Sequence, residues 1–168
     1  LQQHYDELTK QGKTVIFIAI DNQLKGLMAI SDKVKADSAK AIKQLKSQGL
    51  KVIMLTGDNK QAADYIAQQV GIDEVIAEVL PQDKMQHVKK LQQQGLSVAM
   101  VGDGINDAAA LTQANVGIAM GGGADVAIEA ADMALMVSSL THVVDAIYVS
   151  KRTMRNIKQN LFGAFIYN

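Results

Sequence analysis

Two aspartates in one glycine-containing loop are the residues of this sequence best suited to chemistry. Asp103 and Asp107 stand four positions apart, and Gly102 and Gly104 flank the first of them. Proteins hold a hard cation such as Mg²⁺ with one or two carboxylates together with phosphate oxygens. The pair is therefore a candidate magnesium site, although Asp and Gly are also ordinary loop and helix-capping residues.

A buried strand is expected to position this loop. Residues 96–101 form a short, nearly continuous apolar run, which predicts a strand buried on both faces. The two glycines permit backbone geometry and close approach that a Cβ would forbid. Open α/β sheets bind their ligands at the carboxyl ends of the strands, so the loop lies where a ligand is expected.

Two further segments carry groups suited to phosphate. Thr56 ends an apolar run and is followed by Gly57 and Asp58 at the expected start of a helix, where backbone N–H groups favour phosphate oxygens. Alternatively, Thr56 or Asp58 only caps that helix. Lys84 lies in the first turn of another expected helix, where its charge opposes the helix dipole. A phosphate or an aspartate should compensate it.

Alternation of helix and strand from residue 36 predicts a parallel sheet with crossover helices. The expected helices cover residues 36–48, 59–70, 81–94 and 124–130, and the expected strands cover residues 50–56, 74–79, 96–101, 116–120 and 132–137. Gly49, Gly71 and Gly95 stand where helices should end in left-handed caps. In such a sheet the segments that hold Thr56, Lys84 and Asp103 lie at the carboxyl edge of the strands. They can therefore form one pocket.

The ends of the chain differ from this alternating part. Residues 1–12 have a short polar helix pattern, and residues 13–20 and 24–31 predict a hairpin. We therefore place boundaries that give segments 1–31, 32–139 and 140–168, the last being a long helix.

Composition excludes several classes of function. Lysine plus arginine (17) equals aspartate plus glutamate (17), so no overall field favours nucleic acid. The absence of cysteine excludes thiolate metal sites and agrees with a cytosolic setting. His4, His87 and His142 show no metal-ligand spacing.

Two other segments have a chemical and a structural interpretation. Asp32 ends a run of apolar residues and is a candidate nucleophile, but the residues after it lack the second acid or glycine of a phosphate-binding turn. A boundary or cap role is favoured. Residues 121–123 are all glycine and either cradle phosphate or form a tight connection.

Near the C-terminus, a group of basic residues is followed by a short apolar run. The cations are Lys151, Arg152, Arg155 and Lys158, and the apolar residues are 161–167. This apolar run is too short to cross a bilayer, which needs about 20 residues. It is either the start of a membrane helix on the cytoplasmic side or part of an amphipathic helix packed on the domain.

Taken in order, four motifs resemble those of the phosphorylation domain of heavy-metal-transporting P-type ATPases. They are MLTGDN at 54–59, LPQDK at 80–84, VGDGINDA at 101–108 and GGGADVAIE at 121–129. LFGAFIYN at 161–168 resembles the start of the membrane helix that carries a Tyr-Asn pair, here Tyr167 and Asn168, at the transport site of the copper and silver subclass. This favours a membrane helix at the chain end and Cu⁺ as the transported ion.

The resemblance implies a haloacid-dehalogenase-like, doubly wound α/β fold and a role for each matching residue. Thr56 would hydrogen-bond the phosphoryl group, Gly57 and Asp58 would shape its loop, and Lys84 would neutralise phosphoryl oxygens. Asp103 and Asp107 would hold Mg²⁺ and Asn106 would contact phosphate, within the loop shaped by Gly102 and Gly104. These roles agree with phosphoryl transfer, which depends mainly on positioning and charge neutralisation.

The sequence departs from the family pattern in ways that limit its own activity. It contains no Asp-Lys-Thr-Gly-Thr stretch, which holds the phosphorylated aspartate of the family, and no Cys-Pro-Cys. Residues 1–31 would be the end of a nucleotide-binding domain. We therefore expect a fragment of an ATP-hydrolysing Cu⁺ exporter at the cytoplasmic face of a membrane. Because it has no phosphorylatable aspartate, the fragment is expected to be inactive alone, and its partners would be the missing nucleophile segment and the remaining nucleotide-binding, actuator and membrane parts.

Two alternatives remain open. The chain is a free-standing phosphohydrolase of the same superfamily that uses Asp32, or it is a non-catalytic partner or regulatory module. Alone, the chain is expected to be cytoplasmic.

Overall fold

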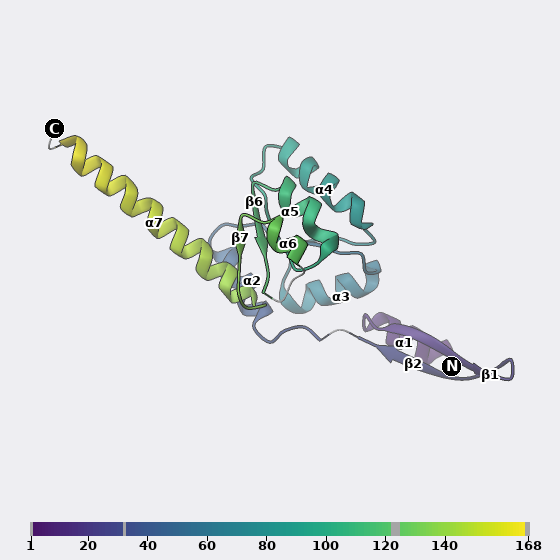
Figure 1. Ribbon diagram of the computed structural model, residues 1–168. Coiled ribbons are helices and arrows are strands. Elements are labelled where there is room, and N and C mark those ends of the chain that lie inside the picture. Colours follow the sequence, from purple (N-terminus) through teal and green to yellow (C-terminus); the bar gives the residue numbers. More distant parts are fainter. Residues whose placement is uncertain (1, 32, 122–124, 167–168) are drawn as a thin grey trace.

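The computed structural model describes residues 2–31, 33–121 and 125–166. Figure 1 shows an α/β core, a hairpin unit at the N-terminal end and a long helix that projects from the core at the C-terminal end. The strands are β1 (Thr14–Ile20), β2 (Gln23–Ile30), β3 (Ile53–Leu55), β4 (Glu74–Ile76), β5 (Ala99–Gly102), β6 (Val116–Ala119) and β7 (Met133–Ala134). The helices are α1 (Gln2–Lys10), α2 (Ser38–Ser47), α3 (Lys60–Val70), α4 (Pro81–Gln93), α5 (Ala108–Gln113), α6 (Asp125–Glu129) and α7 (Leu140–Ile166), with a 3-10 turn at Ile105–Asp107.

The hairpin unit confirms the predicted hairpin. β1 and β2 pair antiparallel, and Asp21 and Asn22 between them have φ values of 50° and 58°. Two consecutive positive φ angles are typical of the tight turn whose twist matches the two strands. Helix α1 covers one face of the hairpin, where the Tyr5 and Phe17 rings stack with centroids 5.2 Å apart.

The parallel pairing predicted for the core is confirmed, but it is divided between two sheets. β3 pairs with β4, and β5, β6 and β7 form a second parallel sheet in that order. Within the described residues, β3 and β5 therefore each have one unpaired edge. The expectation that residues 96–101 are buried on both faces is wrong. Leu96 is 48% exposed because it precedes β5, which begins only at Ala99, and Ala99 itself is exposed.

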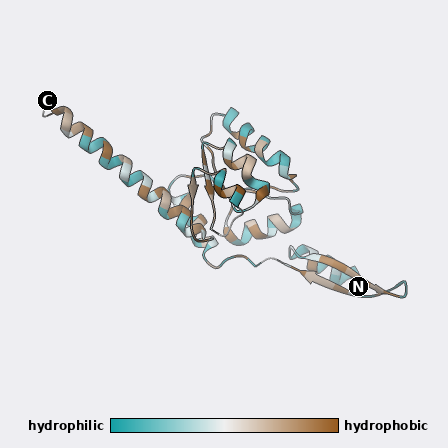
Figure 2. Ribbon diagram, viewed as in Figure 1, coloured by the Kyte–Doolittle hydropathy of each residue, from teal (hydrophilic) through white to brown (hydrophobic). Residues whose placement is uncertain are grey.

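The first turns of α7 pack between helix α2 and the sheet of β5, β6 and β7. Val144 packs with Ala41 and Leu45 of α2, while Val143 packs with Ile118 and Met120 of the β6 region. Leu140 and Ile147 of α7 contact both clusters. Figure 2 shows hydrophobic segments of the ribbon where α7 meets the core.

The predicted helix ends are confirmed where glycine follows a helix. Gly49, Gly71 and Gly95 have φ values of 82°, 79° and 82°, the left-handed conformation of a C-terminal cap. Helix α7 spans 27 residues, and residues 148–162 are all exposed. The alternative of an amphipathic helix packed on the domain therefore applies only to its beginning. In the part of the chain that the structure describes, no helix is long and apolar enough to cross a membrane.

Candidate functional site

A largely buried ion pair connects two of the predicted chemical segments. The Lys84 Nζ atom lies 2.7 Å from Asp107 Oδ1, and the two side chains are only 15% and 11% exposed. Lys84 stands in the first turn of α4, which begins at Pro81 after the cap residue Leu80. The compensating group expected for this lysine is therefore an aspartate of the loop after β5.

The glycine before Asp103 is required by the packing of Asp107. A Cβ added at Gly102 would lie 2.7 Å from the Asp107 Cβ, so the aspartate side chain folds back against the end of β5. At Gly104 an added Cβ would meet nothing closer than 3.7 Å, and φ is an ordinary −118°. The close-approach reason given for both glycines therefore applies to Gly102 alone. Instead, the Gly104 N–H points at Asp107 Oδ2, 3.4 Å away.

Thr56 and Asp58 hydrogen-bond to each other instead of capping α3. The Thr56 hydroxyl donates to Asp58 Oδ2 over 2.8 Å, and the Asp58 N–H donates to Thr56 Oγ1 over 3.1 Å. The cap of α3 is Asn59, whose side chain accepts from the Ala62 N–H at 2.9 Å. Capping of α3 is thus not the role of Thr56 or Asp58.

The segment after β4 holds this loop in place and was missed by the sequence reasoning. The Glu78 N–H donates to the Asp58 carbonyl (2.9 Å), and the Val79 N–H donates to the Thr56 carbonyl (3.1 Å). Glu78 has a φ of 58°, which is uncommon for a residue other than glycine and marks sites constrained by their surroundings. No glycine or asparagine at that position signals it in the sequence.

The structure thus places the three predicted segments in one chain of contacts. The Thr56 loop is bonded to the residues that lead into α4, and Lys84 of α4 is bonded to Asp107. Asp103 and Asn106 are exposed beside this pair, as are Gly57 and Asp58 at the other loop. Asp32, Tyr167, Asn168 and residues 122–124 lie outside the described residues.

The carboxylate oxygens of Asp103 and Asp107 are of the kind that binds Mg²⁺, with the other ligands coming from water or phosphate. Within the described ranges, no group of three or more histidine, cysteine or acidic side chains is placed to hold a metal ion. Mg²⁺ does not need such a cage, since it keeps several waters and is commonly bound by one or two carboxylates plus substrate phosphate. Exposed Asp103 and the second oxygen of Asp107 supply hard donors of this kind.

Comparison with known families and proteins agrees with this geometry. Residues 1–115 match the family model of haloacid dehalogenase-like hydrolases, and the chain belongs to this family.

Similar proteins narrow the resemblance further. Copper-transporting ATPase 1 of Rhizobium meliloti (strain 1021) is 55% identical over 163 residues, 97% of this chain and 20% of that protein. A copper-exporting P-type ATPase of Staphylococcus epidermidis is 53% identical over 98% of this chain and 20% of its own length. The chain thus spans about a fifth of the length of these relatives.

A solved structure shows the same relationship in three dimensions. The crystal structure of a zinc-transporting PIB-type ATPase in an E2.Pi state superposes with a TM-score of 0.85 at 44% identity, covering 95% of this chain and 26% of that protein. The resemblance to heavy-metal-transporting P-type ATPases that was based on the four motifs is confirmed.

Proposed function

We propose that this chain is part of a copper-exporting P-type ATPase and carries the Mg²⁺ and phosphate half of its phosphorylation site. The intact protein would hydrolyse ATP through an aspartyl-phosphate and move Cu⁺ out across a membrane. Copper is supported by the relatives at 55% and 53% identity and by the Tyr167-Asn168 pair in the sequence.

The observation that carries the proposal is the buried Lys84–Asp107 ion pair at 2.7 Å. A buried lysine held at one loop by a single carboxylate can also donate to phosphoryl oxygens that arrive beside it. The Thr56 hydroxyl would donate from the neighbouring loop that Gly57 and Asp58 shape, and Asn106 would contact phosphate.

Asp103 and Asp107 are the proposed Mg²⁺ ligands, in the loop shaped by Gly102 and Gly104. When bound, Mg²⁺ neutralises charge on the phosphoryl oxygens, which is a main requirement of phosphoryl transfer. The remaining work of the described residues is to position those oxygens and to supply hydrogen-bond donors.

The chain alone is proposed to bind Mg²⁺ and phosphate but not to hydrolyse ATP, since the sequence lacks the Asp-Lys-Thr-Gly-Thr stretch. Its partner is the rest of the ATPase, which would supply the nucleophile, most of the nucleotide-binding domain, the actuator domain and the membrane part. The site would lie at the cytoplasmic face of that membrane.

Calorimetric titration tests the half-site with Mg²⁺ and inorganic phosphate as the probes. We expect Mg²⁺ to strengthen phosphate binding in the unmodified chain, and Asp103→Asn to abolish that strengthening. Asp6→Asn, on helix α1 of the hairpin unit, is the matched control and should behave like the unmodified chain. Equal titrations for all three proteins would overturn the proposal.

Intact-mass measurement after incubation with acetyl phosphate and Mg²⁺ tests the missing nucleophile. We expect an unchanged mass. A hydroxylamine-sensitive phosphate adduct would contradict this expectation, and its loss in Asp32→Asn would support the free-standing phosphohydrolase instead.

A further inference from the structure

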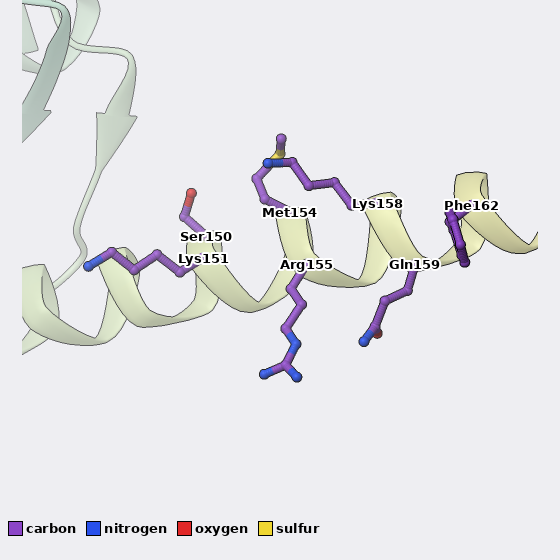
Figure 3. Close-up of a pocket in the computed structure, with 7 residues that line it drawn as sticks. All are labelled: Ser150, Lys151, Met154, Arg155, Lys158, Gln159 and Phe162. Carbon is purple, nitrogen blue, oxygen red and sulfur yellow. The ribbon is translucent and has the colours of Figure 1, made fainter.

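The proposed donors to phosphate do not line an open groove. The groove that Figure 3 shows lies on α7 and is lined by residues between 150 and 162. Thr56 and Lys84 instead follow two neighbouring strands, since Thr56 comes directly after β3 and Lys84 stands in α4 after β4. Their spacing therefore depends on how the chain passes from β4 into α4.

The chain between β4 and α4 contains one extra residue. The Thr56 N–H donates to the Ile76 carbonyl over 3.0 Å, and the Thr56 carbonyl accepts from the Val79 N–H over 3.1 Å. In a regular parallel ladder the second donor would be the residue two positions after Ile76, which is Glu78. The insertion is therefore a bulge, and bulges are common next to active sites, where they re-aim a side chain.

Glu78 holds the Thr56 loop through both its backbone and its side chain. Its φ of 58° lies in the left-handed region, which is uncommon for a residue with a Cβ. In this conformation its N–H donates to the Asp58 carbonyl over 2.9 Å. Its Oε1 accepts a longer hydrogen bond, 3.5 Å, from the Lys60 N–H at the start of α3. The loop is thus fastened on both sides of Asn59.

Gly57 fits closely against the same bulge. A Cβ added at Gly57 would lie 3.3 Å from the Val79 carbonyl oxygen, which is tighter than an ordinary contact. Val79 is buried, so its carbonyl has little freedom to withdraw. Leu80, the next residue, is the N-cap of α4, and Lys84 follows in the first turn. The bulge therefore contacts the Thr56 loop on one side and leads directly into the helix of Lys84 on the other.

We infer that Glu78 is a positioning residue, whose left-handed conformation sets the spacing between the Thr56 hydroxyl and the Lys84 ammonium. The Glu78 carboxylate is itself anionic and donates nothing to phosphate, so it acts through these two donors. Its role in phosphate binding rests on the proposed function, whereas the spacing can be measured without a ligand.

Pulsed EPR on the ligand-free chain tests the spacing. The chain has no cysteine, so Gln61→Cys/Gln86→Cys places spin labels only at exposed positions of α3 and α4. Glu78→Gly permits a left-handed φ and should leave the distance distribution unchanged. Glu78→Val opposes it and should shift or broaden the distribution. Both substitutions remove the carboxylate, so its loss cannot explain a difference between them.

Asn22→Val is the matched control. Asn22 has the same φ of 58° in the hairpin turn, away from the phosphate half-site, so this substitution should leave the distances between α3 and α4 unchanged. Circular dichroism verifies that each variant folds. If Glu78→Val does not fold, Gly57→Ala replaces it, because its Cβ would press on the Val79 carbonyl and should shift the same distances.

Calorimetric titration of inorganic phosphate in the presence of Mg²⁺ tests the consequence for binding. Glu78→Val should weaken phosphate binding about tenfold, as expected for one lost hydrogen bond to a charged group. Glu78→Gly and Asn22→Val should bind phosphate like the unmodified chain.

Three results would overturn the positioning role of Glu78. They are equal EPR distances in Glu78→Val and Glu78→Gly, equal phosphate affinities in these two variants, and a loss of affinity in Glu78→Val no larger than in Asn22→Val. A failure of the proposed function is recognised separately, because the unmodified chain would then bind no phosphate while the EPR distances still decide whether Glu78 sets the spacing.

Discussion

The position of Lys84 in the sequence already predicts that its charge has a negatively charged partner, although it does not identify that partner. A lysine in the first turn of a helix is electrostatically unfavourable, and the structure compensates it with the carboxylate of Asp107. Because both side chains are nearly buried, neither charge is well solvated if the other is removed.

Lys84→Met should therefore destabilise the chain by about 3 kcal/mol, the cost typical of leaving one partner of a buried ion pair uncompensated. Adding Asp107→Asn should recover part of that loss, because the unpaired charge is then gone. Urea unfolding measures both effects. Lys89→Met, at an exposed position of the same helix, is the control, and a Lys84→Met loss no larger than the control would contradict this account.

The Thr56 loop shows where residue types alone are insufficient. Thr56, Asp58 and Asn59 are all residues that favour a helix N-cap, and only the structure shows that Asn59 takes that position. Glu78 was missed because its positive φ arises from hydrogen bonds to another loop, which no local pattern encodes.

At the scale of elements, the segment before α2 is fastened to the start of α7. Ser139 Oγ donates a hydrogen bond to Asp37 Oδ2, and Lys35 Nζ donates to Ser138 Oγ at 2.6 Å. The hydrogen bond from Ser139 is the main reason that the pKa of Asp37 lies below its ordinary value of 3.8. These contacts position α7 relative to the segment that leads to the hairpin unit.

Ser139→Ala should raise the pKa of Asp37 toward 3.8, which a titration of its carboxyl ¹³C shift would measure. Since the lowered pKa favours the charged form in the folded state, its stabilisation is present above pH 3.8 and lost as the pH falls through the folded-state value. Ser138→Ala, whose hydroxyl contacts Lys35 instead, should move the Asp37 pKa much less. A similar shift in both variants would refute the assignment.

Helices were predicted more accurately than strands for a physical reason. Their caps are local, as Gly49, Gly71 and Gly95 illustrate. The core strands are only two to four residues long, and their extent depends on neighbours distant in sequence. The unpaired edges of β3 and β5 therefore could not be read from the apolar runs.

At the scale of the whole molecule, one face of the hairpin unit is uncovered. Ile16 and Met28 are paired across the two strands and are 45% and 51% exposed. Directly opposite residues of an antiparallel pair lie on the same face, so they form one apolar surface, while α1 covers the other face.

Ile16→Lys/Met28→Lys should reduce concentration-dependent self-association of the chain, because exposed apolar patches favour association. Sedimentation velocity over a range of protein concentrations measures it. Gln3→Lys/Gln23→Lys adds the same charge at exposed positions of the same unit and should reduce association less. If the two variants behave alike, net charge and not this face controls association.

The hydrogen bonds of the half-site also imply a thermodynamic coupling. The Thr56 hydroxyl and the Lys84 ammonium already donate to the carboxylates of Asp58 and Asp107, so an incoming anion must compete with acceptors that belong to the protein. A divalent cation bound by Asp103 and Asp107 would neutralise the carboxylate that holds Lys84 and so release the Lys84 donor. Anion and cation should therefore each raise the affinity for the other by the same factor, as reciprocal linkage requires.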